Sequence, residues 1–238
     1  CALKKAHPRP PSGAALYSKN KDLWSGTMLK LVFFRDQLHA GSEHTFDAAV
    51  PRAIYTRVGA PTIRAAGVLA TLAPNAAWHG SVGAVRVVVG KTDAEIYRWE
   101  LHRDAVPNGA TMVSELSIDA KQAWLMRCDR VDFPLGGVAL TPTHQGPGIR
   151  CLLNGALKVA SAGHELNIKP GEPWFESGPD PVLANASETE LTAFARVMIL
   201  PAALLGGKTS ISYVLPEDRD KPKRQTYQLF VDEPIATA

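Results

Sequence analysis

The chain has 238 residues, of which 45% are hydrophobic, enough to bury the core of one large domain or of two compact domains. Eighteen prolines and nineteen glycines, against four methionines, predict many turns and short strands rather than long helices. The formal net charge is +3, but the first 21 residues contribute +5 with no acidic side chain, so the rest of the chain carries −2. This slightly acidic body argues against nucleic acid as a partner.

Residues 1–29 are predicted to be a basic, proline-containing arm at the start of the chain. The stretch His7–Gly13 holds three prolines and few apolar side chains, which is typical of a solvated extension without a core of its own. Contact with an acidic partner or nucleic acid is the alternative for this arm.

The three cysteines, Cys1, Cys128 and Cys151, are too few and too irregularly spaced for a disulfide framework. We expect reduced thiols and a cytoplasmic protein, with Cys128 and Cys151 buried among apolar neighbours. A cysteine at position 1 leaves open an upstream segment or a lipid anchor. The longest apolar run, Val197–Gly207, is interrupted by Pro201 and is shorter than the roughly 20 residues that a membrane helix needs. No membrane partner is therefore expected.

An internal repeat with an offset of 96 residues is the most informative feature of the sequence. Eight residues between positions 51 and 81 recur 96 positions later, and most are Gly, Pro or Trp, whose backbone or packing demands are strict. The pairs are Pro51 and Pro147, Gly59 and Gly155, Ala60 and Ala156, Ala66 and Ala162, Gly67 and Gly163, Pro74 and Pro170, Trp78 and Trp174, and Ser81 and Ser177. Two residues of slippage later, Tyr97–Trp99 lies opposite Ala195–Val197. The repeat predicts two copies of one fold.

Each copy is predicted to alternate short strands with tight turns. The strands expected in the second copy are Ile149–Leu153, Ala156–Ala160, Leu166–Ile168 and one that begins at Trp174–Phe175. Gly155, Gly163 and Pro170-Gly171 separate them as turns. Short strands with regular Gly and Pro punctuation are typical of a sandwich or barrel. Ser117–Arg127 is the best helical candidate, although a linking strand fits it equally well.

The second copy resembles a cupin domain. Residues 141–155, from Thr141-Pro142-Thr143-His144 to Asn154-Gly155, resemble the first cupin motif, in which His-x-His and a Glu precede an apolar strand that ends at Gly. Lys169–Glu176 and then Asn185–Ser187 resemble the second motif, in which a Pro-Gly turn leads through a strand to a third His and an Asn. The resemblance, extended by the repeat to about residues 30–215, implies an all-β chain of two tandem cupin-type, jelly-roll-like barrels with few short helices. The expected domains are the arm 1–29, a first barrel 30–115 and a second barrel 116–238.

The resemblance also implies one divalent metal ion (Fe, Mn, Ni or Zn), because cupins hold such an ion with imidazole and carboxylate groups. In the register set by Gly155, only His144 matches a ligand. Pro142, Gly148 and Val182 stand at or near the places of the first His, the Glu and the third His, and Ala48, Arg52 and Arg86 stand at ligand places in the first copy. The site is expected to be metal-free or to recruit ligands from elsewhere.

Four residues of the second copy are candidates for a site. His144 is a candidate metal ligand or general base, with a hydrogen-bonded barrel histidine as the alternative. Strand alternation places Trp174 and Glu176 on one face and Phe175 on the other. An inward Glu176 would be a catalytic or ligating group, but an outward surface position is the favoured expectation. Arg150 would suit an anionic substrate, with Trp174 beside it, unless it forms a structural salt bridge.

Other conspicuous residues are expected to have structural roles. His39, His44 and His79 lack metal spacing, and packing is predicted for His79, as it is for Trp24 and Trp99. The charged segment 217–224 is predicted to be a solvated loop. Tyr227–Val231 is a predicted last strand that could pair across a dimer, so a homodimer is expected.

Two functions follow as hypotheses. In the first, the second barrel binds a small organic molecule and acts as a metal-dependent oxygenase, isomerase or lyase through His144 and Glu176, with Arg150 and Trp174 holding the substrate. In the second, the protein is a metal-free, non-catalytic small-molecule binding or sensor protein.

Overall fold

The structure is a computed structural model that describes residues 28–236 except for 82, 104, 120, 140–141, 162 and 215–224. The predictions for Cys1, Trp24, most of the basic arm and the charged segment 217–224 fall outside the described residues. The described part is almost entirely β, and its one helical element is the 3-10 turn η1 (Ala202–Leu204). Among these residues, no helix has the length and apolar character needed to cross a membrane.

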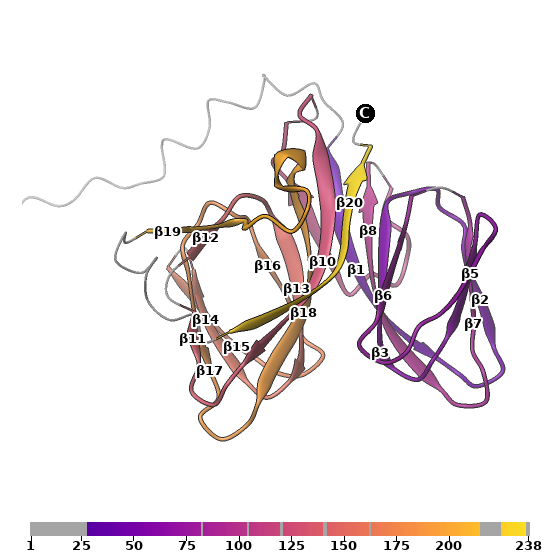
Figure 1. The fold of residues 1–238 in the computed structure, drawn as a ribbon, viewed down its shortest axis with the longest axis horizontal. Helices are drawn as coiled ribbons and strands as arrows, with labels where there is room; N and C mark the ends of the chain where they lie inside the picture. The colour runs from indigo at the N-terminus through magenta and orange to yellow at the C-terminus, as the bar shows by residue number, and fades with distance from the viewer. Residues whose placement is uncertain are drawn as a thin grey trace, which may run out of the picture.

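The strands form two barrels, which lie side by side in Figure 1 with the first in purple and the second in orange. In the first barrel, a five-stranded sheet of order β6-β3-β8-β1-β9 faces a four-stranded sheet of order β2-β7-β4-β5. The strands of this barrel are β1 (Leu29–Leu38), β2 (Glu43–Phe46), β3 (Arg52–Val58), β4 (Thr62–Ala65), β5 (Val68–Thr71), β6 (Ala77–Gly80), β7 (Val85–Val88), β8 (Ala94–His102) and β9 (Met112–Leu116).

The second barrel repeats this plan with the sheets β16-β13-β18-β10-β20 and β11-β17-β14-β15. It adds a separate two-stranded ribbon, β12-β19, that has no counterpart in the described part of the first barrel. The strands are β10 (Trp124–Phe133), β11 (Val138–Ala139), β12 (Pro142–His144), β13 (Gly148–Asn154), β14 (Leu157–Ser161), β15 (His164–Ile168), β16 (Pro173–Glu176), β17 (Val182–Ala186), β18 (Thr192–Pro201), β19 (Ile211–Tyr213) and β20 (Thr226–Ile235).

Residues of β3 and β6 and the residues 96 positions later in the sequence, in β13 and β16, occupy equivalent positions in the strand pairing of the two barrels. Ile54 pairs with Trp78 on one side and Arg98 on the other, and Arg150 pairs with Trp174 and Arg196 in the same way. The β3-β8 and β13-β18 pairs even share a bulge at matching places. Because the two five-stranded sheets correspond strand for strand, a position in one barrel can be compared directly with its equivalent in the other.

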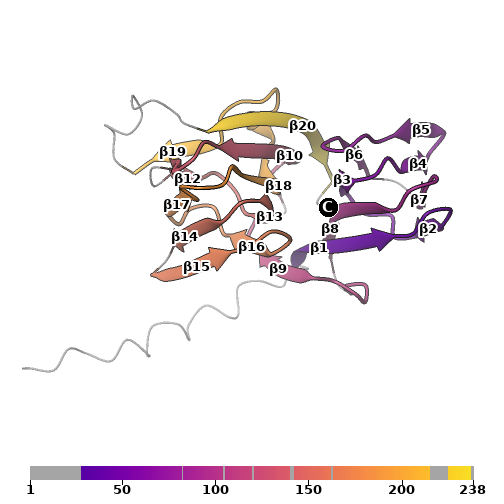
Figure 2. The same ribbon diagram turned by 90° about the horizontal axis from the view of Figure 1, so that it is seen from below.

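One shared apolar core holds the two barrels together. The outward faces of both five-stranded sheets pack against each other through one continuous core, which includes Phe33, Trp99, Cys128, Ile149 and Val197. Figure 2 shows β9 running beside β16 of the other barrel, where the strands contact each other, and β20 contacts β6 in the equivalent way. Each barrel also has its own apolar interior. In both large sheets, alternate residues therefore face either the other barrel or the interior of their own.

Most of the expected strands are confirmed, but the helical alternative for Ser117–Arg127 is wrong. Its second half is the start of β10, where Trp124 and Leu125 are buried in the sheet. Cys128 and Cys151 are buried free thiols, as expected. Tyr227–Val231 lies within β20, which pairs with β10 of the same chain, and pairing across a dimer stays a prediction.

Gly155 is predicted to be much less replaceable than Gly163, although both have a positive φ. A Cβ at Gly155 would lie 2.4 Å from Thr192 Oγ1 and 2.6 Å from the carbonyl oxygen of Leu191, whereas a Cβ at Gly163 meets nothing within 4 Å. We expect Gly155→Ala to lower the free energy of unfolding by roughly 2–5 kcal/mol and Gly163→Ala by about 1–2 kcal/mol, which urea denaturation would measure. If both variants lost the same free energy of unfolding, the positive φ of the turn, and not the close approach to β18, would be the reason that Gly155 must be glycine.

Candidate functional site

The interior of the second barrel contains a small chamber whose lining is mostly apolar, and three strands bring the charged and imidazole side chains Arg150, Glu176 and His144 to it. In β13, Ile149 and Cys151 face the other barrel, so the intervening Arg150 faces inward. In β16 the same alternation points Trp174 and Glu176 into the barrel. The ribbon strand β12 brings His144 to the chamber, where its backbone N–H donates to the carbonyl oxygen of Gly178 at 2.7 Å. The chamber has a volume of about 40 Å³, little more than one water molecule occupies.

All four predicted site residues line this chamber. Glu176 is 9% exposed and inward, so the favoured expectation of a surface carboxylate is wrong. The reason is that Gly148, its partner on β13, and the indole of Trp174 leave space for it inside the barrel: Trp174 Nε1 donates to Glu176 Oε1 at 2.9 Å. Phe175 packs on the opposite side, against the core between the barrels, as alternation predicts.

Arg150 is the dominant charge of the chamber, with no exposed surface. Its Nη1 donates to the carbonyl oxygen of Gly148 at 2.6 Å, and its Nη2 lies 2.6 Å from Glu176 Oε2 as an ion pair. His144 Nε2 lies 3.6 Å from the same carboxylate oxygen, beyond hydrogen-bond distance. Arg150 therefore forms a salt bridge, one of the two roles considered for it, while its Nε has no hydrogen-bond partner among the described residues.

The ion pair does not use the full hydrogen-bonding capacity of these side chains. Arg150 Nε and Nη2, Glu176 Oε2 and His144 Nδ1 are buried and have no hydrogen-bond partner among the residues that the structure describes; the contact between Nη2 and Oε2 is close but not aligned as a hydrogen bond. Buried polar atoms are nearly always partnered, and an unpartnered one costs about 1–3 kcal/mol. All of these atoms belong to residues that line the same chamber.

A wider outer chamber of about 350 Å³ adjoins the inner one, because Arg196, Ile211 and Tyr227 line both. Arg196 binds Asp129 through two hydrogen bonds, of 2.6 and 3.0 Å. The sequence reasoning missed Arg196 and Asp129. The signal was present, since an arginine within the apolar strand Thr192–Pro201 faces the barrel interior when its neighbours face the core between the barrels.

His144 is predicted to be neutral at pH 7 and to make folding pH-dependent. Burial, and then the positive charges of Arg150 and Arg196, hold its pKa well below the usual value of 6.5. The unfolded chain binds the proton more readily, so we expect this contribution to stability to be complete above pH 6.5 and to be lost as the pH falls, by at most about 1.4 kcal/mol per pH unit.

Burial also lowers the pKa of His79, so the contribution of His144 is measured as a difference. Urea denaturation between pH 5 and 7.5 should give a shallower pH dependence for His144→Gln than for the unchanged chain. If the free energy of unfolding changed with pH to the same extent in both proteins, a neutral buried His144 would be contradicted.

No family model matches the sequence, and no curated protein matches it either. Solved structures do match. An oxalate decarboxylase from Lactobacillus farciminis, in a formate complex, aligns at 10% identity over 81% of this chain and 82% of that chain, with a TM-score of 0.63. AerE from Microcystis aeruginosa aligns at 13% identity over 71% and 88%, with a TM-score of 0.57. A salicylate 1,2-dioxygenase from Pseudaminobacter salicylatoxidans aligns at 8% identity over 84% and 75%, with a TM-score of 0.53.

The chain has the tandem cupin fold. At these identities the matches establish the architecture and leave the chemistry to the residues of the site. The predicted all-β fold class of tandem cupin-type barrels is thereby confirmed.

The second cupin barrel does not provide a donor set that fits the expected metal ion. His144 lies at the chamber, but a Cβ at Gly148, where the family's glutamate would stand, would lie 2.5 Å from the carbonyl oxygen of Val197. Val182, near the place of the third histidine, is part of the apolar interior. Glu176 could add one carboxylate, yet the guanidinium of Arg150 already lies against it. Nowhere in the described residues do three or more His, Cys, Asp or Glu side chains gather as a metal site would require.

The first cupin barrel fills the equivalent region with its own side chains. Ile54 and Gly80 replace Arg150 and Glu176 by register, and Arg98 corresponds to Arg196. The guanidinium of Arg98 lies between the rings of Phe34 and Phe46, 3.8 and 3.9 Å from their centroids. The repeat therefore preserved the barrel and changed its interior.

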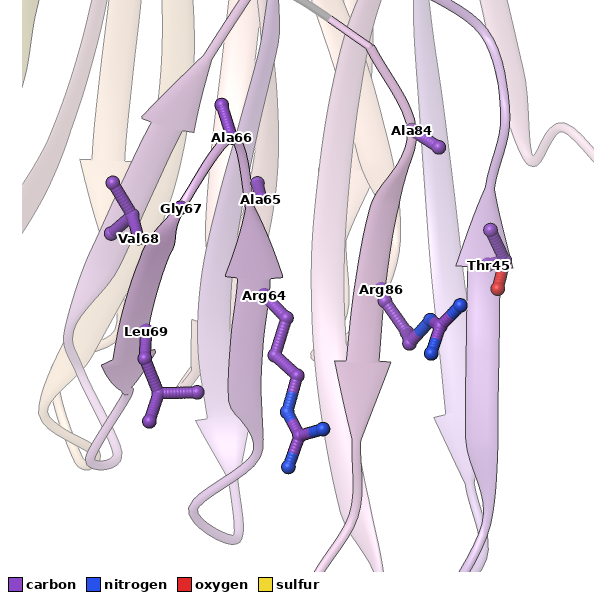
Figure 3. A pocket seen from close by; sticks show the side chains of 9 residues that line it. All are labelled: Thr45, Arg64, Ala65, Ala66, Gly67, Val68, Leu69, Ala84 and Arg86. Carbon is purple, nitrogen blue, oxygen red and sulfur yellow. The ribbon is translucent and has the colours of Figure 1, made fainter.

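The first barrel also has a hollow of about 440 Å³ on the outer face of its small sheet, where Figure 3 shows Arg64 and Arg86 on neighbouring strands. Both arginines are exposed, and Arg86 pairs with Glu43 at 3.0 Å. A hollow lined by exposed residues offers none of the buried, unpartnered polar atoms found in the second barrel.

The histidines of this barrel do not converge on a site either. His44 hydrogen-bonds Ser42, His39 is exposed, and the half-buried His79 lies on β6.

Proposed function

We propose that the second cupin barrel binds a small organic carboxylate without a metal ion, the carboxylate lying against Arg150. The observation that carries the proposal is the buried guanidinium whose Nε and Nη2 lack hydrogen-bond partners among the described residues, at the end of a chamber that widens outward. A guanidinium binds carboxylate oxygens through paired N–H groups, and such charge-assisted bonds are the strong ones.

The charge of the lining favours an anion. Four cationic and two anionic side chains line the two chambers, and Asp232, outside the lining, pairs with Arg127 at 2.9 Å, which leaves an excess of one positive charge among these described residues. The cationic residues are Arg127, Arg150, Arg196 and Lys208, and the anionic residues are Asp129 and Glu176. Burial lowers the pKa of Arg150, but only to about 10, so the guanidinium keeps its charge at neutral pH.

The size of the chambers limits what can bind. The inner chamber has room for little more than the carboxylate group itself, so the rest of the ligand would extend toward the outer chamber, which can hold an aliphatic or aromatic body beside Tyr227 and Ile211. Two of the similar structures are named for carboxylates: an oxalate decarboxylase in complex with formate, and a salicylate dioxygenase. These compounds guide the choice of probes.

A metal-dependent oxygenase, isomerase or lyase is the competing proposal from the sequence. It requires ligands beyond His144, and the chamber offers Glu176 already paired with Arg150. The metal-free binding site uses the same residues without that requirement, so it is the function we favour.

Calorimetric titration of chelator-treated protein with formate, acetate, glycolate, oxalate, benzoate and salicylate tests the proposal. We expect at least one of them to bind, and Arg150→Met to weaken that binding by roughly 10- to 100-fold, the loss of one charged hydrogen-bonding group. Arg64→Met, which removes an exposed arginine from the first barrel, is the matched control and should have no effect.

Because Arg150→Met leaves Glu176 buried without its partner, Arg150→Met/Glu176→Gln should be titrated as well. The proposal is wrong if none of the carboxylates binds, or if binding requires added Fe, Mn, Ni or Zn.

A further inference from the structure

We infer that the second barrel selects 2-hydroxycarboxylates, in which a hydroxyl group next to the carboxylate donates to Glu176. This inference rests on the proposed carboxylate site and names the class of compound that the site takes. The inference comes from Glu176 Oε2, an acceptor to which a ligand with only a carboxylate group can donate no hydrogen bond.

The chamber presents donors and an acceptor side by side. Arg150 Nε and Nη2 can only donate, and Glu176 Oε2 can only accept as long as the carboxylate is ionised. The two groups are 2.6 Å apart at their closest atoms, so a ligand atom bound to Arg150 Nε lies within a few ångströms of Glu176. One small ligand therefore meets both groups at once.

A plain carboxylate satisfies only half of this arrangement. Its oxygens accept from Arg150, but they have no proton to donate to Glu176, and two ionised carboxylates at such short range repel each other. A hydroxyl group on the carbon next to the carboxylate supplies the missing donor, and it lies on the same side as one carboxylate oxygen. Such a ligand is held at two points, and a charge-assisted hydrogen bond to Glu176 offsets the repulsion between the two carboxylates.

The surroundings fix Glu176 in the orientation that this recognition needs. Trp174 Nε1 donates to Oε1, so that oxygen is already occupied and Oε2 is the one turned toward Arg150 and His144. Glu176 is 9% exposed and Trp174 is 2% exposed, so neither side chain can turn out to solvent without opening the barrel interior. The acceptor is thus positioned before the ligand arrives.

His144 extends the same recognition. Its Nδ1 is unpartnered among the described residues, and the ring is 7% exposed at the chamber. A neutral imidazole carries one donor and one acceptor nitrogen, so it can bind either the carboxylate or the hydroxyl of the same ligand. It adds a contact without adding charge.

The test compares two pairs of probes that differ by one hydroxyl group on the carbon next to the carboxylate: glycolate with acetate, and lactate with propionate. Calorimetric titration of the chelator-treated full chain should show the hydroxylated member of at least one pair binding roughly tenfold more tightly or better. Glu176→Gln should bring acetate to within about threefold of glycolate, because the repulsion is gone and the amide can donate to a carboxylate. Glu172→Gln, which changes an exposed carboxyl group four residues earlier, should keep the preference.

The outcomes separate this inference from the proposal on which it rests. Equal affinities within both pairs, lost in Arg150→Met, would overturn hydroxyl selection and leave the carboxylate site standing. Absence of binding by all four probes would overturn both. A preference for the hydroxylated probe that persists unchanged in Glu176→Gln would also overturn the inference, because a group other than Glu176 would then accept the hydrogen bond from the hydroxyl.

Discussion

Replacing Glu100 by alanine should lower the free energy of unfolding by about 3–5 kcal/mol, one of the two largest losses expected in the chain. Glu100 is 1% exposed and bonds three buried partners: Arg52 Nε at 2.5 Å, Arg98 Nη1 at 2.7 Å and His102 Nε2 at 2.8 Å. Arg98 has a second carboxylate in Asp36, but the structure shows none for Arg52. The substitution therefore leaves a buried cation without its counter-charge.

Urea denaturation of Glu100→Ala and of Glu43→Ala would measure this effect. Glu43 also pairs with an arginine, but both side chains of that pair are about half exposed, so its loss should cost less than about 1 kcal/mol. If the two variants lost similar free energies of unfolding, the buried Glu100 network would stabilise the protein no more than an exposed ion pair does.

Glu100 should also dominate the acid sensitivity of the first barrel. Burial alone would raise its pKa, but the hydrogen bond from His102 and the charges of Arg98 and Arg52 outweigh burial and lower it to about 2. A depressed carboxyl pKa adds stability above pH 4.5 that is lost as the pH falls from 4.5 toward 2. Acid denaturation of Glu100→Gln should lack this component.

Replacing Glu176 by alanine should cost a similar 3–5 kcal/mol, because it leaves Arg150, which has no exposed surface, without its counter-charge. Trp174 Nε1 would lose its acceptor in the same step. The matched control is Glu165→Ala, which removes an exposed pair with Lys158 and should cost less than about 1 kcal/mol.

A double-mutant cycle identifies the cause of this loss. Arg150→Met removes the buried charge, so Arg150→Met/Glu176→Ala should be more stable than Glu176→Ala alone, with a coupling of about 1–3 kcal/mol measured by urea denaturation. Additive losses in the cycle would mean that packing, and not the ion pair, accounts for the effect.

The barrels could be predicted from the sequence because their turns impose strict local demands. Gly59 and Gly155 both have φ near +75° to +80°, and at each a Cβ would collide with the start of the neighbouring long strand. Such positions admit few residues other than glycine, so the repeat kept them while most other residues changed. The strand–turn alternation read from these positions is the one that the structure has.

The interior of the second barrel was harder to predict, since alternation gives two faces without saying which is inside. Trp174 and Glu176 were correctly placed on one face, and the wrong face was favoured for the carboxylate. A buried carboxylate is expected only when its partner is known, and Arg150 becomes its neighbour only through the β13-β16 pairing. Arg196 and Asp129 were missed for the same reason, because they meet across β10 and β18.

The metal expectation rested on family positions, and the structure shows what occupies them. Gly148 and Val182 offer no ligand, while the charged groups of the chamber come from Arg150 and Glu176, at positions where the first barrel has Ile54 and Gly80. The 96-residue offset of the sequence repeat already pairs these positions, and the strand register of the two barrels agrees with it. The two interiors diverged on a shared framework.

A crystal structure of chelator-treated protein with saturating glycolate tests the central claim most directly. The account predicts that the carboxylate of glycolate occupies the inner chamber on Arg150 Nε and Nη2, with its hydroxyl on Glu176 Oε2. Glycolate bound only elsewhere, no glycolate at all, or a metal ion coordinated by His144 in that chamber would contradict it.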